Sequence, residues 1–250
     1  MTLSIVMIEK TFVYGDSFSN LEFLSQMGDI LQEQMWYAPF VEGELVDRTK
    51  PGKSPFTMFL QATHDAVTER KTVRMIVALG SCERLPVYTD GWFDEEQLRD
   101  IDPDTPLPSE PKRTTLTDCE RYFDRVVITK QNMHQFHPTM LWANLYKNIL
   151  DLDTRCRAEG HQLVVLHMNA TQDSVWVNKR HPLVRPLCER VESLPNYFDE
   201  SESCRRLCEI AGITPMDASE YGKDGHHGVE GQQHFCRHMR ARIRETGIWN

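Results

Sequence analysis

Residues 12–20 (FVYGDSFSN) end a short apolar run at Gly15 and then present a serine among polar side chains. One interpretation is structural: a strand ends, the glycine turns the chain, and Asp16 or a serine caps the following helix. The other is chemical: Ser17 is a nucleophile held at a strand-to-helix turn. The chemical interpretation requires a general base and oxyanion donors from other parts of the chain.

A second stretch, residues 223–235 (KDGHHGVEGQQHF), places one acid and two imidazoles in a glycine-rich turn near the C-terminus. A histidine can accept the proton of a serine hydroxyl, and a buried carboxylate can orient that histidine. Asp224 is close enough in sequence to orient a neighbouring imidazole. The chemistry that these residues favour is therefore nucleophilic catalysis by Ser17 with a histidine base.

The apolar pattern predicts the elements that would position these side chains. The expected strands are 11–14, 73–79 and 163–167, with 3–8 as a further candidate, and the expected helices are 21–35, 56–67, 138–157 and 232–245. Continuous apolar runs suit strands that are covered on both faces, and strands alternating with helices predict an α/β sandwich. Sites in such folds lie beyond the carboxyl ends of the strands, where Ser17 and the 223–228 loop can meet.

The length of 250 residues suits one core, and we expect a single domain over 1–250. Residues 88–125 interrupt the alternation of strands and helices. This stretch is acidic and contains Pro103, Pro106, Pro108 and Pro111. We expect a long loop excursion on the surface, which is either a lid or a passive insertion.

Composition and charge exclude several classes of partner. The net charge of −9 argues against a nucleic acid or an anionic membrane surface, because both attract proteins with surplus Lys and Arg. Seven cysteines without a paired framework indicate reduced thiols. No signal-peptide pattern and no apolar run of membrane-spanning length are present, so we expect a soluble, cytoplasmic protein without membrane insertion.

The sequence resembles the GDSL/SGNH hydrolase family, and more closely a divergent branch of it found among tailed-phage proteins. Gly15-Asp16-Ser17 matches the first block of the family, and Asp224, His226, Gly231 and the following helix match its last block. The resemblance implies a three-layer α/β/α sandwich with a central, mainly parallel, five-stranded sheet in flavodoxin-like order. It also implies Ser17 as nucleophile, His226 as base and Asp224 as the orienting acid.

The register of the histidine is open. Many family members space the pair as Asp-x-x-His, which would select His227 as the alternative base. The spacing back from Gly231 favours His226. The other histidine would then line the mouth of the site or cap the turn.

The middle blocks of the family match less completely. Gly52, with Ser54 nearby, offers an oxyanion donor after the second strand, although a surface Pro-Gly turn explains the same residues. The third block usually reads Gly-x-Asn-Asp, whereas this chain has Gly80-Ser81-Cys82-Glu83-Arg84 and lacks the asparagine. Loss of one oxyanion donor costs roughly 10²–10³ in rate, so either Ser81 or its backbone substitutes, or the site is less active than is usual for the family. The divergent branch tends to show a Ser or Thr and a Glu-Arg pair at this point, and this resemblance favours substitution, with Glu83 and Arg84 at the site or in a surface ion pair.

The function that the resemblance implies is hydrolysis of oxygen esters, with deacetylation of a carbohydrate or glycan as the favoured reaction and no cofactor. The substrate would be a small-molecule or glycan ester. The alternative is a non-catalytic ligand- or glycan-binding protein on the same fold. If the chain is phage-encoded, either could be associated with the virion.

Two other chemistries are weaker interpretations. Several histidines and one cysteine could suggest a metal hydrolase, namely His134, His137, His226, His227, His234, Cys236 and His238. No HExxH or clustered CxxC spacing accompanies them, so we expect no metal. Cys82 follows a strand but has no basic environment that would activate it. Cys204 and Cys208, four residues apart, fit packing positions on a helix.

Overall fold

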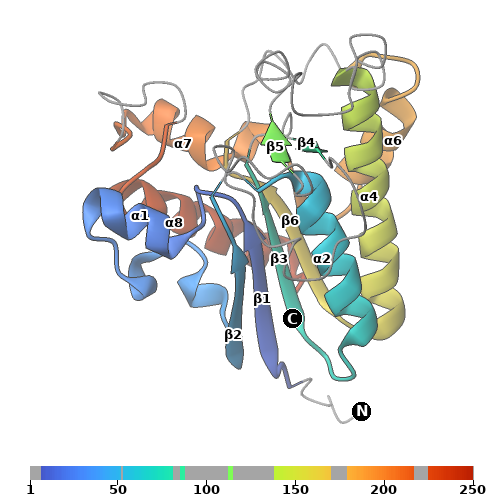
Figure 1. The fold of residues 1–250 in the computed structure, drawn as a ribbon, viewed down its shortest axis with the longest axis horizontal. Coiled ribbons are helices and arrows are strands. Elements are labelled where there is room, and N and C mark those ends of the chain that lie inside the picture. The colour runs from blue at the N-terminus through green and yellow to red at the C-terminus, as the bar shows by residue number, and fades with distance from the viewer. Residues whose placement is uncertain are drawn as a thin grey trace.

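A five-stranded parallel sheet forms the centre of the fold (Figure 1). The computed structural model describes residues 7–51, 53–80, 85–87, 112–114, 138–169, 179–216 and 225–249. The sheet contains β1 (Lys10–Gly15), β2 (Glu44–Thr49), β3 (Arg74–Leu79), β6 (Gln162–His167) and β7 (Tyr197–Phe198). Their spatial order is β2-β1-β3-β6-β7, which is the flavodoxin-like order. The expected fold class is therefore confirmed.

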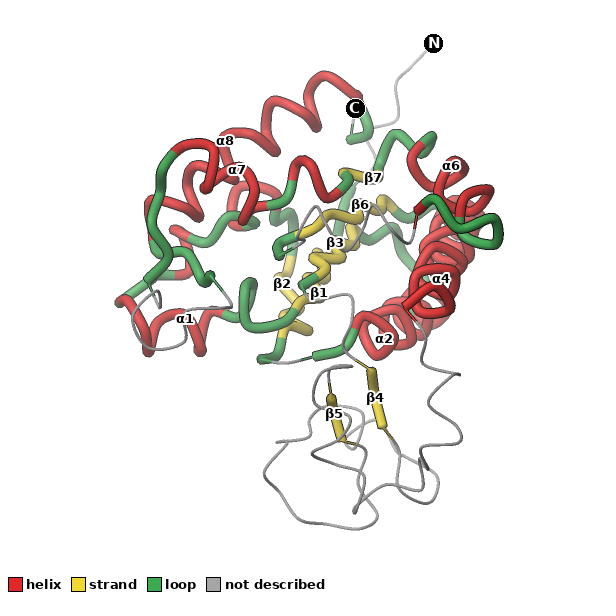
Figure 2. The backbone as a smooth tube through the Cα atoms, turned by 90° about the horizontal axis from the view of Figure 1, so that it is seen from above, coloured by secondary structure: helices red, strands yellow, loops and turns green. Residues whose placement is uncertain are grey.

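Helices cover both faces of the sheet (Figure 2). One face packs against α2 (Pro55–Thr68), α4 (Pro138–Glu159) and α6 (Arg185–Glu192). The other face packs against α1 (Leu21–Gly28), α7 (Cys204–Ala211) and α8 (Val229–Thr246). Alternate residues of β1 and β3 belong to the two cores, and this explains why these strands are apolar throughout.

The register of the strands brings their carboxyl ends to one edge of the sheet. Gly15 at the end of β1 pairs with Thr49 at the end of β2. Leu79 at the end of β3 pairs with His167 at the end of β6. Residues that follow these four strands therefore share one edge, as is usual for sites of open parallel sheets.

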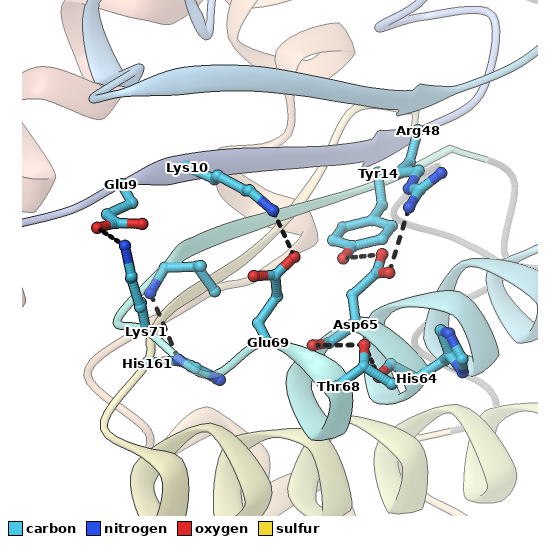
Figure 3. Close-up of polar contacts among 11 residues, drawn as sticks. Glu9, Lys10, Tyr14, Arg48, His64, Asp65, Thr68, Glu69, Lys71 and His161 are labelled. Atoms are coloured by element: carbon cyan, nitrogen blue, oxygen red, sulfur yellow. Dashed lines mark hydrogen bonds and ion pairs between the residues drawn. The ribbon is translucent and has the colours of Figure 1, made fainter.

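Polar contacts also attach α2 to the first two strands (Figure 3). The buried hydroxyl of Tyr14 on β1 donates to Asp65 Oδ2 on α2 at 2.8 Å. Arg48 on β2 lies 3.3 Å from the other oxygen of Asp65. Nearer the start of β1, Lys10 Nζ lies 2.8 Å from Glu69 Oε1. These contacts fix the helix that follows β2 against β1, the strand that precedes Ser17.

Most of the expected elements are present. The strands predicted at 11–14, 73–79 and 163–167 correspond to β1, β3 and β6, and the helices predicted at 56–67, 138–157 and 232–245 to α2, α4 and α8. Of the candidate strand at 3–8, Met7 and Ile8 are not in a strand, and the remainder lies outside the described residues.

The helix predicted over 21–35 is wrong in length. It ends at Gly28, because Asp29 adopts the left-handed conformation (φ 49°) and its N–H donates to Ser25 O. A short 3-10 turn, η1 (Gln32–Gln34), follows, and a second, η2 (Ala38–Phe40), leads toward β2. Helices commonly stop at a residue in the left-handed conformation, and here an aspartate occupies the position that a glycine usually takes.

The expected excursion at 88–125 is described only at β5 (Lys112–Thr114). This strand pairs antiparallel with β4 (Leu85–Val87) in a separate two-stranded sheet. The rest of the excursion lies outside the described residues, and the expectation of a single domain remains a prediction. Among the described helices, none has the length and apolar character needed to cross a bilayer.

Candidate active site

Ser17 lies in a tight turn immediately after β1. The N–H of Ser19 donates to the carbonyl of Asp16 at 3.0 Å, and the N–H of Phe18 donates to the Asp16 carboxylate at 3.1 Å. Asn20 then caps α1, since its side-chain oxygen accepts the N–H of Phe23 at 2.8 Å. The helix cap is thus an asparagine and not the aspartate or serine that the sequence suggested. Asp16 instead stabilises the turn by accepting the N–H groups of Phe18 and Ser19.

This turn packs directly onto the end of β3. A Cβ atom on Gly80 would lie 1.7 Å from Asp16 Oδ2, which is far too close for two atoms that are not bonded. Asp16 is fully buried at this contact. Gly80 is therefore required by the close approach of the Asp16 carboxylate, and the turn that carries Ser17 is positioned by two adjacent strands.

His226 reaches the same edge of the sheet from the loop that precedes α8. Its Nε2 atom lies 2.7 Å from Ser17 Oγ, although 209 residues separate the two in sequence. The backbone N–H of Met216 donates to the carbonyl of His226 at 2.8 Å and holds this loop. An imidazole nitrogen at hydrogen-bond distance from a serine hydroxyl can accept its proton as the oxygen attacks an electrophile.

Two phenylalanines contact the His226 imidazole. Phe18 stacks on it with ring centroids 4.3 Å apart and planes 16° apart. Phe23, from the first turn of α1, lies at 5.1 Å with its plane tilted by 53°. Ser17, Phe18 and His226 are almost completely buried, at 4, 2 and 3% exposure, whereas Phe23 is half-buried. The face-to-face stack on Phe18 thus holds the plane of the imidazole, whereas the Phe23 ring is tilted and lies farther from it.

The His227 side chain packs against α8 and not against Ser17. Its side chain packs against the first turn of α8, where a Cβ on Gly231 would lie 2.4 Å from His227 Cβ. Both ring nitrogens are buried, and the imidazole lies beside the Cys208 side chain of α7. Of the two candidate bases, His226 is the one that the structure brings to Ser17.

The loop after β2 runs beside the Ser17 turn. The N–H of Lys50 donates to Gly15 O at 2.9 Å, and Asn20 Nδ2 donates to Thr49 Oγ1 at 3.1 Å. Lys53 is buried, and its ammonium group donates to Arg48 O at 2.6 Å and also to Gln61 Oε1. Ser54 caps α2, accepting the N–H of Thr57 at 3.3 Å. The loop expected to supply an oxyanion donor is therefore attached to the nucleophile's turn.

Several predicted site residues lie outside the described residues: Gly52, Ser81, Glu83, Arg84 and Asp224. Their roles remain predictions. Cys82, His134 and His137 from the weaker interpretations lie outside the description as well. In the ranges that are described, no group of three or more His, Cys, Asp or Glu side chains is arranged to hold a metal ion.

Sequence reasoning did not find the two aromatic neighbours of the base. Phe18 adjoins Ser17 within the motif, and Phe23 lies three residues beyond the helix cap Asn20. Nothing in the pattern of apolar residues distinguishes them from core residues. Only the return of the His226 loop to this turn shows what they contact.

Comparisons with protein-family models and with curated protein sequences find no match. Solved structures match over nearly the whole chain. The structure of TesA is 12% identical and has a TM-score of 0.48, with 95% of this chain and 99% of that chain covered. Axe2, an acetylxylan esterase from Geobacillus stearothermophilus, is 14% identical with a TM-score of 0.46, covering 98% and 97%.

A third similar structure is a member of the lipolytic protein G-D-S-L family from Veillonella parvula. It is 11% identical with a TM-score of 0.45, and 95% of this chain and 97% of that chain are covered. At these identities the similarity concerns the fold alone.

Proposed function

We propose that this protein is a carboxylic ester hydrolase that uses Ser17 as its nucleophile. The observation that carries the proposal is the distance of 2.7 Å between Ser17 Oγ and His226 Nε2 at the carboxyl edge of the sheet. A serine hydroxyl is a weak nucleophile on its own, and an adjacent base is the usual means of activating it. Burial of both groups also limits competing contacts with water.

The mechanism follows from this pair. Ser17 Oγ attacks the ester carbonyl carbon while its proton passes to His226 Nε2, and the carbonyl oxygen becomes an oxyanion. Collapse of this intermediate breaks the bond to the alcohol oxygen, which takes the proton from His226. Water then attacks the acyl-serine carbonyl while its proton passes to His226. Collapse of this second intermediate breaks the bond to Ser17 Oγ, which takes the proton back from His226, and the acid is released.

The remaining roles are proposed from the family resemblance. Asp224 would orient the imidazole of His226 and stabilise its protonated form. The backbone N–H groups of Ser17 and Gly52, with Ser81 in place of the missing asparagine, would stabilise the oxyanion. The proposed substrate is a small acyl ester, with an acetyl group on a carbohydrate or glycan as the favoured case.

Hydrolysis of p-nitrophenyl esters of increasing acyl length tests this function. We expect the wild-type protein to hydrolyse the acetate at neutral pH and Ser17→Ala to lose that activity while remaining folded. If well-folded wild-type protein leaves both the acetate and the longer esters untouched, the esterase proposal is wrong. A non-catalytic binding protein would then be the better interpretation.

A further inference from the structure

The proposed mechanism determines which part of an ester lies beside His226. The imidazole gives its proton to the leaving alcohol, so the alcohol oxygen must come within hydrogen-bond distance of Nε2. The group attached to that oxygen then extends past the edge of the imidazole, away from Ser17. Side chains next to the imidazole and open to solvent therefore contact the alcohol part of the ester and not its acyl part.

Phe23 is the side chain with these properties. It touches the His226 ring at 5.1 Å between centroids, and it is half-buried, whereas Phe18, His226 and Ser17 are nearly inaccessible. Phe18 is already covered by its face-to-face stack on the imidazole. Of these four residues, Phe23 offers the apolar surface that remains open beside the base.

The position of Phe23 is fixed by its backbone. It is in the first turn of α1, and its N–H donates to the Asn20 cap at 2.8 Å. Asn20 in turn donates to Thr49 on the end of β2. An aromatic ring on an anchored helix turn loses little conformational freedom when a ligand packs against it, which favours its use as a binding surface.

We propose that Phe23 selects the alcohol part of the ester and favours alcohols that contain a ring. A six-membered ring, such as a pyranose with its C–H face or an aryl group, covers a phenylalanine ring more completely than a short alkyl chain does. Between aromatic rings, such packing stabilises the contact beyond what the buried area alone contributes. This inference rests on the proposed ester hydrolysis and adds the alcohol specificity of the same site.

The test compares two acetate esters that share an acyl group and differ in the alcohol. One is ethyl acetate, and the other is a mono-O-acetylated methyl glucopyranoside. We expect Phe23→Leu to lower kcat/KM for the sugar ester by about tenfold, corresponding to roughly 1.4 kcal/mol, and to change kcat/KM for ethyl acetate by less than about twofold. Phe23→Trp, which retains an aromatic surface, should keep the preference for the sugar ester.

A matched control uses the same substitution at Phe56. This residue is half-buried in the first turn of α2, and among the described contacts its ring does not meet His226. Phe56→Leu should leave the ratio of the two kcat/KM values unchanged. Labelling of Ser17 by a fluorophosphonate should proceed at similar rates in wild type and Phe23→Leu, because this probe carries no alcohol ring.

The remaining outcomes overturn the proposal in distinguishable ways. An equal loss on both esters together with slow labelling would show that Phe23 acts only by supporting His226. No change on either ester would show that the alcohol does not contact Phe23. If wild type neither hydrolyses an ester nor labels with the probe, the proposed function itself fails, and the alcohol specificity fails with it.

Discussion

The side chains of Ser17 and His226 form the contact on which the proposed chemistry depends. Changing either should remove nearly all ester turnover, by about 10³-fold or more, and Ser17→Ala/His226→Ala should be little worse than either single variant. His227→Ala should keep about a tenth of the activity or more, because its imidazole packs on α8 and does not reach Ser17. Steady-state kinetics with p-nitrophenyl acetate measures all four variants. The reverse ranking of the two histidines would contradict this assignment.

The sequence pattern predicted a histidine base but left the choice between His226 and His227 open. The roles of Ser17, His226 and Asp224 were predicted from the resemblance of their motifs to the GDSL/SGNH family, and two spacings of the acid and base were compatible with that family. The structure adds a physical reason for the spacing back from Gly231, since the missing side chain of Gly231 accommodates His227. With His227 turned toward the helix, His226 is the residue that faces the end of β1.

The turn after β1 packs against the end of β3 at Gly80, and we expect this contact between two elements to affect both stability and activity. Gly80→Ala would force the Asp16 carboxylate away, since the new Cβ would lie 1.7 Å from Oδ2. We expect a loss of about 1–3 kcal/mol in the free energy of unfolding, with a fall in ester turnover because Ser17 moves with Asp16. Urea denaturation and kinetics measure the two effects.

A second substitution tests whether this contact is the cause. In Asp16→Ala/Gly80→Ala the clashing carboxylate is absent, so the double variant should be less destabilised than the sum of the two single changes. Strict additivity would mean that Gly80 is required for some other reason.

The buried hydrogen bond between Tyr14 on β1 and Asp65 on α2 should contribute more to the free energy of unfolding than a surface ion pair does. Asp65→Ala leaves the buried Tyr14 hydroxyl without its acceptor, which should cost about 1–3 kcal/mol of stability. Tyr14→Phe/Asp65→Ala removes both partners and should recover part of that loss. Lys10→Ala, at a half-exposed ion pair with Glu69, is the control, and we expect it to cost less than about 1 kcal/mol. If Asp65→Ala costs no more than Lys10→Ala in urea denaturation, the buried contact is not important.

The elements that the sequence predicted are those with continuous burial. β1, β3 and β6 are apolar on both faces, and α2, α4 and α8 have clear apolar stripes. β2 was missed because it is an edge strand in which charged Glu44, Asp47 and Arg48 interrupt the apolar pattern. β7 was missed because it has only two residues, Tyr197 and Phe198, too few for any periodicity.

For the whole molecule, a buried polar network at the end of β6 predicts how stability depends on pH. His167 Nε2 lies 2.9 Å from the Tyr197 hydroxyl and 3.7 Å from Glu200, which pairs with Lys179 at 2.8 Å. Burial lowers the pKa of His167 below its ordinary 6.5, and the Lys179 charge adds to this, whereas Glu200 and Asp199 oppose it. The native state therefore holds His167 neutral where the unfolded chain takes up a proton.

The sign of the effect follows from that difference. As pH falls below about 6.5, the unfolded state binds the proton first, so the free energy of unfolding decreases. We expect His167→Gln to show a weaker decrease between pH 7 and pH 5 than wild type in urea denaturation. Identical profiles for wild type and His167→Gln would exclude His167 as a source of the pH dependence.

The proposed site joins the two ends of the chain, since Ser17 follows the first strand and His226 precedes the last helix. Labelling with a fluorophosphonate probe tests most directly whether this junction activates Ser17, because it requires no knowledge of the natural substrate. We predict that wild type labels rapidly and that mass spectrometry places the adduct on Ser17. Ser17→Ala should not label, and His226→Ala should label at least about 10²-fold more slowly. Folded wild-type protein that remains unlabelled, or labels at the same rate without His226, would contradict the account.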